Sequence, residues 1–69
     1  MQYIVIELQG TGESVANIVT THDTINEAES KYHQILGAAA VSSVPVHAAV
    51  ILTDEGHSMK HECYKHITE

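Results

Sequence analysis

Four segments of the chain are predicted as strands, and in two of them, residues 2–8 and 15–22, successive side chains alternate between two faces. Residues 2–8 and 15–22 are rich in valine and isoleucine, which is typical of strands. The segment between them, residues 10–14, contains two glycines and predicts a turn. Residues 46–53 and 59–67 repeat this arrangement around a turn at 54–57. The pattern therefore predicts two β-hairpins.

A helical pattern separates the two hairpins. Apolar side chains between Ile25 and Ala39 follow helical spacing, and Thr24 with Glu27 forms a capping-box pattern at the start. The helix must end before Pro45, and we place its end between residues 36 and 41. The prediction is one α+β domain of ββαββ order, a four-stranded, mainly antiparallel sheet with one helix packed on one face.

A long uncharged stretch covers the end of the helix and the third strand. No Asp, Glu, Lys or Arg lies between Tyr32 and Thr53, and eleven of the fifteen residues 38–52 are apolar. Polar residues interrupt the stretch too often for it to cross a membrane. We interpret it as a helix end, a small-residue connection and a central strand covered on both faces. One helix covers one face, so the stretch predicts a homo-oligomer, with the interface residues Val46, Ala48, Ala49, Val50 and Ile51.

Charge and cysteine content narrow the classes of partner. Nine acidic residues face three lysines and no arginine, giving a formal charge of −6. This composition argues against direct binding of nucleic acid, which needs cations at the phosphates. The acidity either keeps a small protein in solution or favours a basic protein partner. Cys63 is the sole cysteine and the N-terminus lacks a basic segment, so we expect a cytoplasmic protein without disulfides.

The C-terminal segment concentrates the side chains that can bind metal. They are His57, His61, Cys63 and His66. A regular strand presents His61 and Cys63 to one face and His66 to the other, and the spacing is not that of a zinc finger. We therefore expect no metal and no cofactor, although a small metal-binding domain remains an alternative. A Cys63 nucleophile would need a base such as His47 or His61 and oxyanion donors, so we expect no catalytic residues and no enzyme.

Two residues of the uncharged stretch are candidates for ligand contact. His47 is a satisfied core group, a pH-sensitive interface residue or a ligand contact. Tyr32 either lines a pocket between helix and sheet or supplies aromatic bulk to the core. Together with Ser42 and Ser43 of the connection, they mark where a small ligand would bind.

Four segments resemble a group of known proteins. They are residues 28–36 (AESKYHQIL), 38–47 (AAAVSSVPVH), 52–56 (LTDEG) and 62–66 (ECYKH). They are similar to short proteins without an assigned function, encoded by phages and prophages of gut Firmicutes, and the similarity spans Tyr3 to His66. The resemblance implies a phage accessory protein that acts in the bacterial host cytoplasm or is built into the virion.

The expected function is therefore non-enzymatic binding by a self-associating protein. In a counter-defence setting it would block a host protein or sequester a small signalling molecule. The alternative from another class is a structural virion or assembly component.

Overall fold

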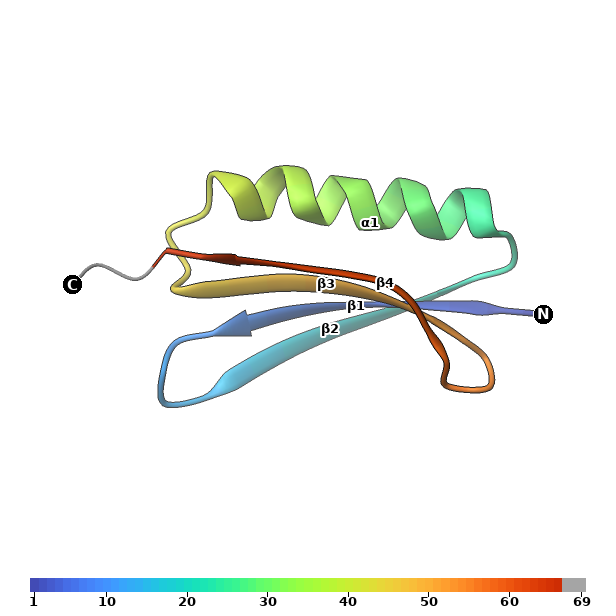
Figure 1. Ribbon diagram of the computed structural model, residues 1–69, viewed down its shortest axis with the longest axis horizontal. Helices are drawn as coiled ribbons and strands as arrows, with labels where there is room; N and C mark the ends of the chain where they lie inside the picture. The colour runs from blue at the N-terminus through green and yellow to red at the C-terminus, as the bar shows by residue number, and fades with distance from the viewer. Residues whose placement is uncertain (67–69) are drawn as a thin grey trace.

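A computed structural model describes residues 1–66 as one helix and four strands. The strands are β1 (Tyr3–Gly10), β2 (Val15–His22), β3 (Val46–Thr53) and β4 (Ser58–Lys65), and the helix is α1 (Ile25–Ala40). Every pairing is antiparallel, in the order β2-β1-β3-β4, and α1 lies along one face of the sheet (Figure 1). The predicted α+β fold of ββαββ order is confirmed. The predicted end of the fourth strand, at residue 67, lies outside the described residues.

Local signals set the ends of these elements. The Thr24 side chain caps α1 by accepting a hydrogen bond from the Glu27 N–H, which satisfies one of the free donors of the first turn. The helix continues through Gly37 to Ala40, within the range expected from the sequence. Gly12 and Gly56 have φ angles of 95° and 87° in the two hairpin connections, where glycine avoids steric strain.

The pairing register divides the side chains of the sheet between two faces. Val5 pairs with Ile51, and these residues lie beneath α1 together with the other members of the same alternating rows. Ile6 pairs with Val50, and their row points to the opposite side of the sheet. We call these the covered face and the open face. In Figure 1, α1 runs along the covered face while the open face is on the far side of the sheet from it.

The hydrophobic core lies between α1 and the two central strands. The helix packs mainly on β3 and β1. Ala28 and Ala39 of the helix and Ala49 of β3 are fully buried, and their small side chains suit a close approach of helix and sheet. The remaining buried apolar residues are Val5, Tyr32, Ile35 and Ile51.

The uncharged stretch occupies the positions expected from the sequence. It forms the second half of α1, the connection at residues 41–45 and the central strand β3. No helix within residues 1–66 combines the length and apolar character that crossing a membrane requires.

Candidate functional site

The open face of the sheet is an apolar surface that no element within residues 1–66 covers. Its two central rows come from β1 and β3, and these side chains are half-buried against one another. Val15 and Val19 of β2 extend the surface and are 65% and 55% exposed. The central rows consist of Ile4, Ile6, Leu8, Val46, Ala48, Val50 and Leu52.

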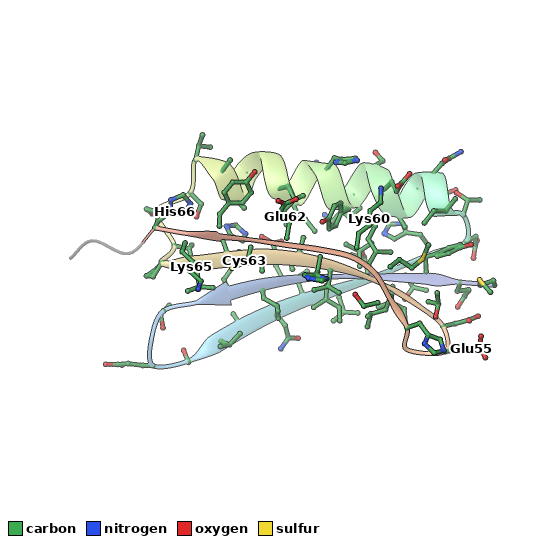
Figure 2. All side chains as sticks on the ribbon, viewed as in Figure 1. Glu55, Lys60, Glu62, Cys63, Lys65 and His66 are labelled. Carbon is green, nitrogen blue, oxygen red and sulfur yellow. The ribbon has the colours of Figure 1, made fainter. Side chains whose placement is uncertain are left out.

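The carboxylates of the described strands avoid the open face. The strand carboxylates Glu7 and Glu62 pair across the ladders with Ala49, and all three belong to the covered face. Figure 2 shows Lys60 and Glu62 directed toward α1 and Lys65 directed away from it. Lys65 pairs with Val46, so it lies at the β4 margin of the open face. In a chain of formal charge −6, this surface therefore carries no strand carboxylate.

The structure separates the five predicted interface residues. Val46, Ala48 and Val50 lie on the open face, where a partner can reach them. Ala49 and Ile51 lie on the covered face and are 0% exposed, because α1 packs on them. This corrects the expectation for these two residues, since strand alternation places neighbours on opposite faces.

His47 is buried beneath the helix and bound to a carboxylate. Its Nε2 lies 2.6 Å from Oε2 of Glu7, and Gln9 Nε2 donates to the same oxygen at 3.0 Å. Partial burial of Glu7 favours its neutral form, but hydrogen bonds from His47 and Gln9 and the nearby positive charges outweigh this, so the pKa of Glu7 is lowered. An ionised carboxylate only accepts, so the His47 Nε2–H donates. The other ring nitrogen, Nδ1, is buried without a hydrogen-bond partner among the described residues.

Tyr32 lies at a groove between α1 and the edge strand β4. The groove has a volume of about 510 Å³ and is also lined by Leu36, Met59, Lys60 and Glu62. Burial, and secondarily the Glu62 charge, raises the pKa of the Tyr32 hydroxyl. At the groove margin Lys60 donates to Glu29, which raises the pKa of the amine and lowers that of the carboxyl.

The two serines predicted to contact a ligand lie apart from this groove. The Ser42 hydroxyl accepts a hydrogen bond from the Val44 N–H at 2.9 Å and so shapes the connection before β3. Ser43 is exposed in the same connection. The structure therefore does not gather Tyr32, His47, Ser42 and Ser43 into one pocket, because His47 is enclosed beneath α1 while Tyr32 faces β4.

The C-terminal ligand-type residues have separate environments. By the register of β3 and β4, His61 and Cys63 belong to the open face, with His61 opposite Val50 and Cys63 opposite Ala48. His66 follows β4, and its Nε2 lies 2.7 Å from the Ala39 carbonyl oxygen at the end of α1. Within residues 1–66, no three His, Cys, Asp or Glu side chains are close enough to hold a metal ion. Cys63 and His47 lie on opposite faces, so they do not form a nucleophile–base pair.

Comparisons with known proteins do not assign the chain to a family. The chain matches no family model, no curated protein and no solved structure.

Sequence reasoning missed Glu7 as the partner of His47. The two residues are 40 positions apart, and their contact depends on β1 and β3 being neighbours. One signal was present, because Glu7 shares its alternating row with the apolar residues Tyr3 and Val5. A carboxylate in a half-buried row requires a donor.

Proposed function

We propose that the protein works by binding rather than by catalysis and that its working unit is a homo-oligomer formed through the open face. The observation that supports this most directly is the composition of that face. It presents aliphatic side chains from the central strands and no strand carboxylate, although the chain carries a formal charge of −6. Two copies repel each other least across such a surface.

The size of the open face is adequate for a dimer. Each of the four strands has eight residues, so the sheet measures roughly 26 Å by 19 Å, or about 500 Å² in projection, at ~3.3 Å per residue and ~4.8 Å between strands. Two copies packed face to face remove about 1,000 Å² from water by this measure. That value reaches the lower bound expected for a specific interface.

The resemblance of the sequence implies a phage accessory protein, and the biological setting that we propose for it is counter-defence. Blocking a host protein fits the acidic remainder of the surface better than nucleotide capture does. A nucleotide would need cations at its phosphates. Of the three lysines, Lys60 is already paired with Glu29, and Lys65 lies on the open face, away from the groove at Tyr32. A virion or assembly component is the second candidate, and it is favoured by the same open face.

Native mass spectrometry of the purified chain tests the proposal. We expect an ordered oligomer that Val50→Glu dissociates, because the substitution places a carboxylate at the centre of the open face. Ala48→Glu is a second variant on the same face, and it replaces a smaller side chain than Val50→Glu does. Ala38→Glu, at an exposed position of α1, is the matched control and leaves the mass unchanged. A monomeric wild type, or an oligomer that resists both open-face variants, contradicts the proposal.

The same measurement separates the classes of binding. An oligomer without added mass supports a protein target or assembly. Stoichiometric added mass in a protein purified from the bacterial cytoplasm supports a small ligand and contradicts the preference for a protein target.

A further inference from the structure

The two edges of the sheet differ in their protection against pairing with another chain. Edge strands expose unpaired backbone N–H and C=O groups, and proteins usually protect them with charges, bulges or a covering element. The edge strand β4 carries Lys60, Glu62 and Lys65, and its pairing with β3 contains an irregularity at Ile51/Leu52. The edge strand β2, at residues 15–22, contains no Asp, Glu, Lys or Arg over eight residues. Only the β4 edge therefore shows these protective features among the described strands.

The β2 edge also exposes apolar side chains on both faces of the sheet. Val15 and Val19 lie on the open face, and Ile18 lies on the covered face opposite Glu7 of β1. Ile18 remains 52% exposed because α1 packs mainly on β1 and β3 and leaves β2 largely uncovered. Packing of two copies through their open faces would bury Val15 and Val19 but would leave Ile18 exposed on the covered face.

We propose that β2 is a second self-association surface, at which β2 of one copy pairs antiparallel with β2 of another and continues the sheet. A two-fold axis perpendicular to the sheet makes this contact self-complementary, because each strand supplies the same N–H and C=O groups to the other. The absence of like charges removes the usual electrostatic obstacle to pairing two identical strands.

The faces of the strand restrict the register. Residues that oppose each other in an antiparallel ladder share a face, so even-numbered positions of β2 oppose even-numbered positions of the partner. In the registers that pair the most residues, the two-fold axis passes through the centre of the strand, so that either Ile18 or Val19 lies opposite its own copy in the partner. In both registers Ile18 is buried between the two sheets and is contacted by the partner strand.

The two self-association surfaces are compatible in one assembly. Pairing at β2 keeps α1 of both copies on one side and joins the two open faces into one continuous surface, with Val15 and Val19 near its middle. Stacking two such double sheets through the open face gives a four-chain assembly. The β2 contact itself does not depend on the open-face contact of the proposed function, whereas the four-chain assembly requires both.

Charge substitution separates the two contacts by mass. Ile18→Lys places a lysine at the β2 edge, opposite Glu7, where it does not touch the open face. Met59→Lys, on the other edge strand at a residue that is 45% exposed, is the matched control. Sedimentation and native mass spectrometry should give four chains for the wild type and for the control, and two for Ile18→Lys. Val50→Glu should also give two chains, and the double variant one.

Each alternative outcome identifies the contact that fails. If Val50→Glu yields monomers and Ile18→Lys leaves the wild-type mass unchanged, the β2 proposal is wrong and the open-face proposal survives. If Ile18→Lys yields monomers while Val50→Glu leaves a dimer, β2 pairing survives and the open-face proposal fails. A monomeric wild type overturns both.

Cross-linking provides an independent test of the β2 contact. In a Cys63→Ser background, Ile18→Cys and Val19→Cys each place a thiol at one of the two axis positions. Directly opposed Cβ atoms in a ladder lie about 4.5–5.5 Å apart, close to disulfide geometry. We expect a covalent dimer under mild oxidation at one of these positions and none with Met59→Cys. Failure at both positions contradicts the pairing.

Discussion

The His47 Nε2–H donates a 2.6 Å hydrogen bond to Glu7 Oε2 across the two central strands. In the ladder His47 pairs with Gln9, so its ring reaches diagonally to the carboxylate while Gln9 donates to the same oxygen. The side chains of His47 and Glu7 are 5% and 15% exposed. A charge-assisted hydrogen bond thus lies next to an apolar core, where losing one partner costs more than it does at the surface.

We predict that His47 and Glu7 are energetically coupled. His47→Ala removes the donor and leaves a part-buried carboxylate, so the free energy of unfolding should fall by about 1–3 kcal/mol. Urea unfolding of the two single alanine variants and the double variant, at a fixed chain concentration, measures the coupling. His47→Gln is the control, because its amide can still donate toward Glu7. Additive losses within error would contradict the coupling.

Glu7 should also give the stability a dependence on acid pH. Its pKa is lowered in the folded protein because the hydrogen bonds and charges around it outweigh its desolvation. The unfolded state therefore binds more protons in this range, and stability rises with pH. The contribution is complete above the ordinary Glu pKa of about 4.3 and is lost as the pH falls through the lower folded-state value.

Urea titrations between about pH 6 and pH 3 measure this effect. The difference in free energy of unfolding between the wild type and Glu7→Gln should shrink as the pH falls. Glu55→Gln, in the exposed turn before β4, is the control and should follow the wild type. A difference between wild type and Glu7→Gln that is independent of pH would show that the carboxylate is not stabilised as described.

The helix cap provides a prediction of a local kind. Thr24→Ala removes the acceptor that the Glu27 N–H uses, so we expect a loss of about 1 kcal/mol in the free energy of unfolding. Thr24→Ser retains a hydroxyl and should lose far less. Thermal unfolding followed by circular dichroism compares the two, and equal losses would show that the hydroxyl does not stabilise the helix.

The secondary structure was predictable because its signals are local. The short apolar run at residues 46–53, between Pro45 and the turn at 54–57, predicts β3 with the bounds that the structure shows, and Thr24 marks the start of α1. The face of each strand residue was less accessible, since the all-apolar run Ala48–Leu52 does not show which row meets the helix. The sequence therefore groups Ala49 and Ile51 with Val50, although α1 buries the first two.

The predicted ligand residues depended on information that the sequence does not contain. Tyr32 and His47 are both buried, yet the neighbours of each side chain follow from the strand order and from the position of α1 on the sheet. Strand order also brings Glu7 to His47, across 40 positions. Likewise, the sequence of β2 shows that the strand lacks charges, but only the strand order shows that it lies at an edge of the sheet.

The close approach of α1 to the sheet predicts unequal tolerance at neighbouring alanines. Ala39 is 0% exposed and faces the sheet, whereas Ala38 is exposed on the other side of the helix. Ala39→Leu forces extra volume into a packed layer and should destabilise the fold by about 1–3 kcal/mol. Ala38→Leu adds the same atoms at the surface, where effects usually stay within about 0.5 kcal/mol. Urea unfolding of both variants decides the matter, since similar losses would mean that the small residues of α1 do not set the distance between the helix and the sheet.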